Sequence, residues 1–248
     1  VSIKDHFAVI VRGPNFCFAC ADHCRSSPIF FYGNAISNDA HTLRLQKNIN
    51  KPNIRAVRDA AMAGFVTGSE TLFAGLNQLE AGTCAFWKTG QRGPDIRQHS
   101  IYLPQNIKTA GLSSLIDEFL TVMDTAIKRG IEQAAGRPVW VALSGGLDSR
   151  ILLAKLVEHN CPNLSAFTYG PRASDEARIA QEVAQRLSVP WSPYFTNGQH
   201  MKTFFSTPQL RKYWDFSDGL SSVPNFQDFL SLKLLQEKGA IPEGTFII

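Results

Sequence analysis

The sequence predicts a two-domain protein of mixed α+β and α/β class. A β-rich domain is expected in residues 1–105 and an α/β domain with a parallel sheet in residues 106–248. Short apolar segments separated by clusters of Gly, Pro, Asn and Asp fill the first part, which is typical of strands and turns. Strand-like and helical patterns alternate in the second part. Between the two, residues 94–105 are polar and contain two prolines, as expected of a connection between domains.

The first part contains four strand-like segments and one short helix. Strands are predicted at Phe7–Val11, Phe16–Ala21, Ile29–Tyr32 and Thr83–Lys88. Residues Ile54–Ala63 have the spacing of a short helix, and a turn-rich connection follows them. This part is therefore expected to be mainly β.

The second part opens with a long amphipathic helix, Leu112–Gln133. After it the sequence predicts a strand at 139–143, a helix at 148–158, a strand at 164–169, a helix at 175–187 and a short strand near 191–195. Right-handed crossovers would make these strands parallel, and ligands of such sheets bind where strands end and helices begin. The loop after residue 143 and the strand end at residues 168–170 should therefore face one crevice, where adenosine is expected.

The loop after the strand at 139–143 has the composition of an anion-binding loop. It reads Ser144-Gly145-Gly146-Leu147-Asp148-Ser149 and leads into a helix. The glycines let backbone N–H groups converge on one anion, the helix N-terminus adds partial positive charge, and the serines add hydroxyl donors. Asp148 would repel a bare phosphate, so we predict that it binds Mg²⁺ between its carboxylate and the phosphate oxygens. No Lys follows the glycines, which excludes the G-x-x-x-x-G-K-[ST] loop. The alternative is a Gly- and Ser-rich turn without catalytic meaning.

Composition excludes several other classes of protein. The net charge is +4, but Lys and Arg are scattered, so nucleic-acid binding is not predicted. No stretch of the sequence has the length and apolar character of a membrane span or the pattern of a signal peptide, and a cytoplasmic enzyme is expected.

Five cysteines, an odd number, favour reduced thiols over a disulfide framework. Cys17, Cys20 and Cys24, with His23 beside them, could be drawn as a metal site. A buried apolar strand is the preferred interpretation, since a fourth ligand at matching spacing is missing.

The loop resembles that of the PP-loop ATP pyrophosphatases, and three further segments extend the resemblance to the asparagine synthetase family of glutamine-dependent amidotransferases. Residues 21–31 are similar to that family's Arg-Asp-x-x-Gly-x-x-Pro-Leu-Tyr-Tyr pattern in the glutaminase domain. Residues 64–82, with Thr71-Leu72-Phe73-Ala74-Gly75-Leu76, are similar to its Thr-Leu-Phe-x-Gly-Ile stretch. Residues 166–177 are similar to its strand, variable loop and acidic helix start. The resemblance thus spans nearly the whole chain.

By this resemblance, residues 106–248 would form an ATP-binding synthetase domain that uses Mg²⁺ to adenylate a carboxylate, aspartate or a related acid. Ammonia, free or derived from glutamine, would then displace AMP to form an amide. Leu143, through its backbone, and Tyr169 would line the adenine site, although core packing is an equal interpretation of Tyr169. The resemblance assigns no catalytic side chain.

Departures from the family are equally informative. The family's glutaminase needs an N-terminal cysteine, whereas this chain begins with Val1, and Arg25 stands where the family has a turn glycine. Residues 1–105 are therefore expected to form a partial glutaminase-like domain without glutamine hydrolysis, with a separate or missing glutaminase part. Residues 244–248 resemble a strand that precedes a second Gly-rich loop in the family, so the synthetase domain is expected to be truncated at its C-terminus.

Two other functions remain open at this point. One is a degenerate, non-catalytic nucleotide-binding module, and the other is a β-lactam-synthetase-like ligase on the same fold. A homodimer is also left open. Asp175 and Glu176 could contact substrate or metal, but we favour a role in stabilising a helix start capped by Ser174.

Overall fold

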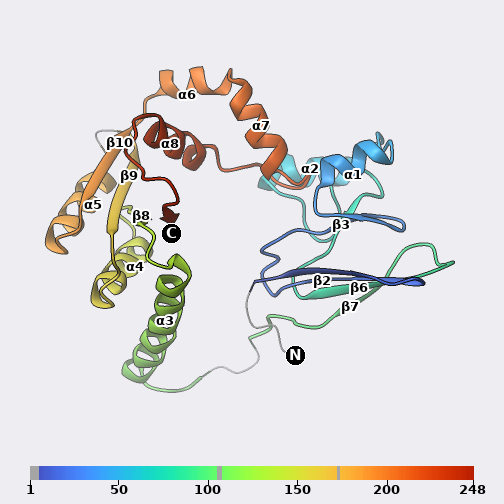
Figure 1. Cartoon of the computed structure of the whole chain (residues 1–248), viewed down its shortest axis with the longest axis horizontal. Helices are drawn as coiled ribbons and strands as arrows, with labels where there is room; N and C mark the ends of the chain where they lie inside the picture. The colour runs from blue at the N-terminus through green and yellow to red at the C-terminus, as the bar shows by residue number, and fades with distance from the viewer. Residues whose placement is uncertain (1–5, 105–107, 172–173) are drawn as a thin grey trace. The chain divides into compact units, whose positions relative to one another are not determined.

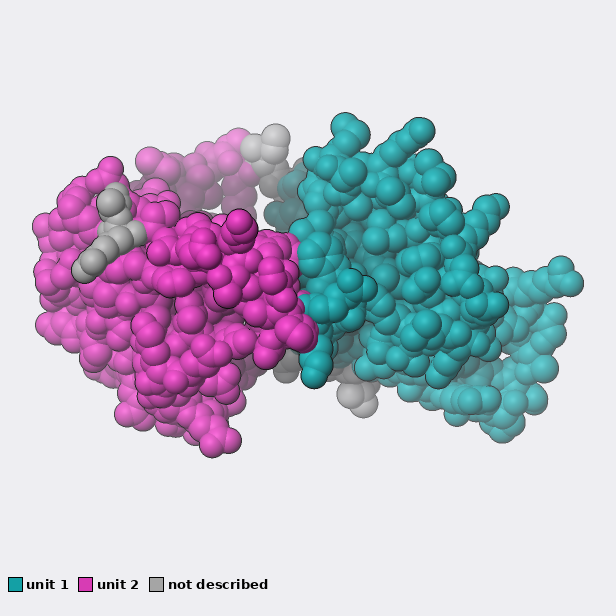
Figure 2. Space-filling view, turned by 90° about the horizontal axis from the view of Figure 1, so that it is seen from above, with its two compact units in different colours: residues 1–106, 211–224 teal, residues 107–210, 225–248 magenta. Residues whose placement is uncertain are grey.

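The computed structural model describes residues 6–104, 108–171 and 174–248. Contacts divide the chain into two compact units (Figure 2). Unit 1 comprises residues 1–106 and 211–224, and unit 2 comprises residues 107–210 and 225–248. Two assignments stay predictions: residues 1–105 as a partial glutaminase-like domain, and residues 106–248 as a truncated synthetase domain.

Two small antiparallel sheets form the centre of unit 1. The first has the order β1-β2-β6-β7 and the second the order β4-β3-β5. Alternate residues of β2 and β6, including Ala19, Ala85 and Trp87, pack against Ile29 and Phe31 beside the second sheet. The strands are β1 (Ala8–Arg12), β2 (Phe16–Ala21), β3 (Phe30–Tyr32), β4 (Ala35–Ser37), β5 (Asn77–Gln78), β6 (Thr83–Lys88) and β7 (Asp95–Gln98).

Two short helices complete unit 1, and each begins at a side-chain cap. Asp39 accepts a hydrogen bond from the backbone of Thr42 at the start of α1 (Ala40–Gln46). Asn53 does the same for Ala56 at the start of α2 (Ile54–Ala63). Gly64 ends α2 with φ +80°, a conformation that favours glycine.

A distant segment, residues 218–224, is hydrogen-bonded into unit 1. The N–H of Val66 donates to the carbonyl of Ser221 at 2.7 Å, and the N–H of Val223 donates to the carbonyl of Gly64 at 2.7 Å. Leu220 is buried beside Phe30 and other core residues of unit 1. Nothing in the sequence pattern indicates this return of the chain.

Unit 2 is an α/β structure with a parallel sheet in the order β10-β9-β8-β11. Helices α3, α4 and α5 pack on one face, where Val141 and Ala166 point, and α8 packs on the other, against Trp140 and Phe167 (Figure 1). The strands are β8 (Val139–Ala142), β9 (Leu164–Gly170), β10 (Trp191–Phe195) and β11 (Phe246–Ile247). The helices are α3 (Leu112–Ala134), α4 (Leu147–Glu158), α5 (Asp175–Arg186), α6 (Gly198–Phe205), α7 (Pro208–Ser217), which ends in unit 1, and α8 (Phe226–Glu237).

The predicted parallel α/β fold of the second part is confirmed, and one expectation about the connection before it is wrong. Residues 94–105 were expected to form a polar connection, but β7 lies within them and pairs with β6. All four residues of β7 are exposed, so this edge strand has no apolar alternation that could reveal it. The short elements β4, β5, α1 and α6 to α8 were also not predicted.

The strand order brings the carboxyl ends of β8 and β11 side by side. The N–H of Ala142 donates to the carbonyl of Ile248 at 3.1 Å. Helices leave β8 and β9 toward one face, whereas α8, which precedes β11, covers the other. This is a topological switch point, the place where open α/β sheets bind ligands.

Candidate functional site

The predicted anion-binding loop leaves the carboxyl end of β8 at this switch point and is closed by its two serines. The hydroxyl groups of Ser144 and Ser149 are 2.9 Å apart, and the N–H of Ser144 donates to Oγ of Ser149 at 3.0 Å. Oγ of Ser144 also accepts from the N–H of Gly146 at 3.1 Å. These bonds hold the loop in a tight turn at the start of α4.

Gly145 is required by a close approach and not by a left-handed backbone. A Cβ at this position would lie 2.8 Å from Cα of Glu176, in the first turn of α5. Neither Gly145 nor Gly146 has a positive φ. The loop glycines were expected to avoid a clash with a Cβ atom, and at Gly145 the residue that would clash is Glu176, which lies against the loop.

The N-terminus of α4 has the groups needed to bind an anion. Its N-cap, Gly146, provides no side-chain hydrogen bond, so the first N–H groups of the helix are free to face a ligand. Asp148 lies in this first turn and is exposed, and no ion pair to it occurs among the described residues. Its position leaves the carboxylate accessible to a cation.

A buried hydroxyl group binds the backbone carbonyl of Leu143, the residue that follows β8. Thr168, 5% exposed, donates from Oγ1 to the carbonyl of Leu143 at 2.7 Å and accepts from Nε1 of Trp191 at 2.9 Å. The N–H of Leu143 donates to the carbonyl of Phe167 at 2.8 Å. The backbone of Leu143 is thus already hydrogen-bonded on both sides, and its predicted role beside adenine stays a prediction.

Tyr169 lies at the carboxyl end of β9 and combines packing with a polar contact. Its ring is partly buried against the cluster formed by Trp140, Phe167 and Leu235, and its hydroxyl donates to Oδ1 of Asp228 in α8. Burial of the phenol and its bond to the carboxylate raise the pKa of Tyr169 to about 12. Tyr169 therefore packs in the core and also lines a pocket, and its place beside adenine stays a prediction.

That pocket, called here the β9–β10 pocket, lies at the carboxyl ends of these two strands. Its volume is about 710 Å³, within the usual range of ligand pockets of about 300–1,000 Å³. Residues of β9, β10, α6 and α8 line it, among them Tyr169, Gly170, Thr196, Asn197 and Gln227. The pocket has room for a nucleoside, whereas the Ser144–Ser149 loop is not part of its lining.

The structure thus places Ser144, Gly145 and Gly146 in the loop, Leu147 to Ser149 in the first turn of α4, and Tyr169 at the neighbouring strand end. Asp228 was missed, because α8 was not predicted. A signal existed: Asn225 caps α8 and accepts from the N–H of Asp228 three residues later, which is the spacing of a capping box before an apolar run. Ser174 caps α5 as expected, accepting from the N–H of Ala177 at 3.2 Å.

The residues of the loop fit the predicted magnesium ion in part. Carboxylate oxygens are ligands that Mg²⁺ prefers, and it is commonly held by one or two carboxylates together with phosphate oxygens. Asp148 provides one such group, and Glu176 lies against Gly145. In the described ranges no cluster of three or more His, Cys, Asp or Glu side chains could hold a metal by itself. Any such ion would therefore depend on phosphate oxygens for further ligands.

Among the helices that the structure describes, none combines the length and the apolar character needed to cross a membrane. All five cysteines are free thiols.

Comparison with known proteins gives one family match. Residues 118–222 match the family model described as asparagine synthase. The matched segment contains the Ser144–Ser149 loop, β8, β9 and β10, and it ends within residues 211–224 of unit 1. No curated protein matches the sequence.

Among the solved structures that match, two NAD synthetases show weak similarity. One is the NH₃-dependent NAD synthetase of Campylobacter jejuni subsp. jejuni NCTC 11168 in complex with nitrate, at 15% identity and a TM-score of 0.38, covering 53% of this chain and 54% of that one. The other is the glutamine-dependent NAD⁺ synthetase of Acinetobacter baumannii in complex with ADP, at 14% identity and a TM-score of 0.34, covering 96% of this chain and 49% of that one. The chain thus spans about half the length of either structure.

Proposed function

We propose that the chain is an ATP-dependent, AMP-forming ligase of the asparagine synthetase type. Its substrates would be ATP, a small carboxylate such as aspartate or a related acid, and ammonia. The observation that supports this most is the Ser144–Ser149 loop, which lies at a switch point, opens onto uncapped N–H groups of α4, and belongs to the segment matching asparagine synthase.

In the proposed reaction an oxygen of the substrate carboxylate attacks the α-phosphorus of ATP, and the bond to pyrophosphate breaks. The nitrogen of ammonia then attacks the acyl carbon, AMP leaves, and the nitrogen loses a proton. The free N–H groups at the start of α4 and the hydroxyls of Ser144 and Ser149 would bind the pyrophosphate part, and Tyr169 would border the adenosine. Magnesium bound through Asp148 would neutralise charge on the departing pyrophosphate.

The remaining parts of the proposal concern partners and location. Ammonia would come from solution or from glutamine hydrolysed by a separate glutaminase part. A cytoplasmic location and the absence of a nucleic-acid or membrane partner stay predictions, and a homodimer stays open.

The first experiment is calorimetric titration of ATP into the full chain with and without Mg²⁺. Binding should depend on Mg²⁺, and Asp148→Ala should weaken it by about tenfold or more, because a charge-assisted contact is lost. Asp117→Ala is the matched control, since Asp117 is an exposed carboxylate of α3 in the same unit. If Asp148→Ala binds ATP with Mg²⁺ as tightly as the wild type, the magnesium assignment is wrong.

The second experiment measures pyrophosphate release with ATP, Mg²⁺, aspartate and ammonia. Release that requires both aspartate and ammonia would establish amide formation. Release with an amino-diacid in the absence of ammonia would indicate a β-lactam-synthetase-like ligase. ATP binding without release for any of a panel of carboxylates would indicate the non-catalytic nucleotide-binding module.

A further inference from the structure

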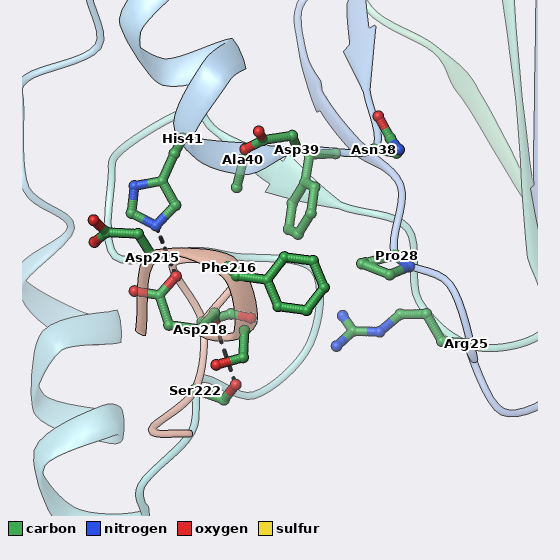
Figure 3. Close-up of a pocket in the computed structure, with 14 residues that line it drawn as sticks. Arg25, Pro28, Asn38, Asp39, Ala40, His41, Asp215, Phe216, Asp218 and Ser222 are labelled. Carbon is green, nitrogen blue, oxygen red and sulfur yellow. Dashed lines mark hydrogen bonds and ion pairs between the residues drawn. The ribbon is translucent and has the colours of Figure 1, made fainter. Parts of the chain in front are cut away.

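A second pocket, formed entirely by unit 1, has polar groups that the proposed ATP chemistry does not use. Its volume is about 300 Å³, at the small end of ligand pockets. It lies between the start of α1 and the segment 215–222, and Arg25, His41, Asp215 and Asp218 are among its lining residues (Figure 3). We call it the α1 pocket. Its size suits a small metabolite better than a nucleotide.

Asp218 is the most informative residue of the α1 pocket. It is only 4% exposed, and its Oδ1 accepts from Leu220 N–H at 3.0 Å and lies 2.8 Å from Nε2 of His41. Its second oxygen, Oδ2, has no hydrogen-bond partner within the described ranges. Among the described residues, Oε2 of Glu70 is the one side-chain oxygen or nitrogen that is both inaccessible to solvent and without a hydrogen-bond partner. Oδ2 of Asp218 therefore remains accessible. This buried, pocket-lining carboxylate thus keeps one oxygen that is neither bonded within the described residues nor sealed from solvent, and a cationic donor would satisfy it.

The two other carboxylates of the α1 pocket, Asp215 and Asp39, already have partners within the protein. Asp215 pairs through Oδ1 with Arg211 at 3.4 Å and is about half exposed. Asp39 binds Thr42 through both oxygens, because it caps α1. Asp218, assisted by Asp215, is therefore the acceptor side of the pocket.

Arg25 supplies the opposite chemistry. In Figure 3 its side chain extends into the pocket from the side opposite His41 and Asp218. One of its guanidinium N–H groups donates to Oε1 of Gln78. For the other N–H groups no acceptor occurs in the described part of the chain. A guanidinium with free donors matches a carboxylate.

The backbone conformation of Arg25 is one that favours glycine over arginine. Its φ is +53°, a left-handed conformation in which glycine is more favourable by about 1 kcal/mol. The local turn would therefore be more stable with glycine, and the guanidinium is what the arginine contributes.

We propose that the α1 pocket binds a small amino acid as its zwitterion, with the ammonium group on Asp218 and the carboxylate group on Arg25. A free acceptor on Asp218 and free donors on Arg25, which lie at opposite sides of the pocket in Figure 3, suit a ligand that carries both charges. The inference does not depend on ATP binding by unit 2. His41 holds Oδ1 of Asp218, which leaves Oδ2 for the ligand.

The test is calorimetric titration of the full chain, without ATP, using glycine, β-alanine and γ-aminobutyrate as probes of increasing charge separation. At least one probe should bind saturably with a stoichiometry of one. The matching analogues that lack either charge, such as propylamine and propionate for β-alanine, should bind about tenfold more weakly or worse. Equal binding of a singly charged analogue, or saturable binding by none of the three probes, would overturn the proposal.

Three variants locate the binding. Arg25→Gly should weaken binding by about tenfold or more while keeping the fold, because glycine adopts the observed φ without strain. Asp218→Asn should weaken it similarly, because the carboxylate charge is lost while an oxygen remains that can accept from His41, and circular dichroism will report whether unit 1 is disturbed. Asp95→Asn is the control, since this β7 residue pairs with Arg97 outside the pocket. If Arg25→Gly binds the probe as the wild type does, the proposal fails whether or not Asp218→Asn folds.

Discussion

Gly145→Ala is the most direct test of how the candidate loop is held. The added Cβ would lie 2.8 Å from Cα, 3.3 Å from Cβ and 3.2 Å from Cγ of Glu176. Carbon atoms pack best about 3.5–4.0 Å apart, so the shortest contact is too close by about 0.7 Å or more. Since Cα of Glu176 is backbone, no rotamer change relieves the overlap, and the loop or the start of α5 must move.

The expected magnitude is the difference between two effects. Overpacking a fixed contact costs about 1–3 kcal/mol. Replacing glycine by alanine where φ is not left-handed stabilises by about 0.4–1 kcal/mol through the unfolded chain. We therefore expect the free energy of unfolding of unit 2 to fall by about 1–2 kcal/mol. ATP binding should weaken as well, because the displaced loop no longer presents its N–H groups in the same direction.

Urea denaturation followed by circular dichroism and tryptophan fluorescence measures this change, with Gly130→Ala as the matched control. Gly130 lies inside α3 with nothing within 4 Å of an added Cβ. That substitution should stabilise by about 0.5–1 kcal/mol, since the same methyl group meets no obstacle in a helix. If Gly145→Ala also stabilised the protein, the loop and α5 would not be in the contact described, and the reasoning would be refuted.

Three further predictions concern buried polar groups. Thr168→Val should lower the free energy of unfolding by about 2–4 kcal/mol, because the carbonyl of Leu143 and the indole N–H of Trp191 lose their hydrogen-bond partner. Denaturant titration measures this change, and a decrease smaller than the error of the method would contradict the prediction. Tyr169 should ionise near pH 12 in an absorbance titration, and the stability that it contributes should be present below its unfolded pKa of about 10 and decline as pH rises toward 12. Burial alone would raise the pKa of Asp22, but its hydrogen bonds to Ser26 and to backbone N–H groups outweigh this and lower it. Asp22 should therefore stabilise the fold above its unfolded pKa of about 3.9 and lose that contribution at lower pH, so Asp22→Asn should flatten the acid side of a stability–pH curve, and an unchanged curve would count against the assignment.

Much of unit 2 could be predicted because its signals are local. The strand at 139–142, the loop and α4 follow one another in the chain, and each has a pattern set by neighbouring residues: an unbroken apolar run, two glycines and a helical stripe. Strands of unit 1 with one buried face, such as Phe16–Ala21 and Thr83–Lys88, were predicted with the same bounds. The exposed β7 was not, because pairing alone defines it.

Only those residues of the candidate site that lie within one continuous segment, or at the end of a predicted strand, could be predicted from the sequence. The six residues of the loop could be read in order, and Tyr169 could be assigned to a strand end. Asp228 contacts Tyr169 across 59 positions of the chain, so its role depends on how α8 packs on the sheet. No spacing within either segment indicates that pairing.

By itself, the sequence determined much of the local backbone of this protein: where most of its longer strands and helices form, and where a glycine-rich turn leads from a strand into a helix. The tertiary structure alone decided which distant groups meet. It returned residues 211–224 to unit 1, set His41 against Asp218 across 177 positions, and placed Glu176 over Gly145. The physical reason is that local patterns reflect interactions within a few residues, whereas contacts between distant segments form only when the packing of a whole core outweighs the entropy lost in closing long loops.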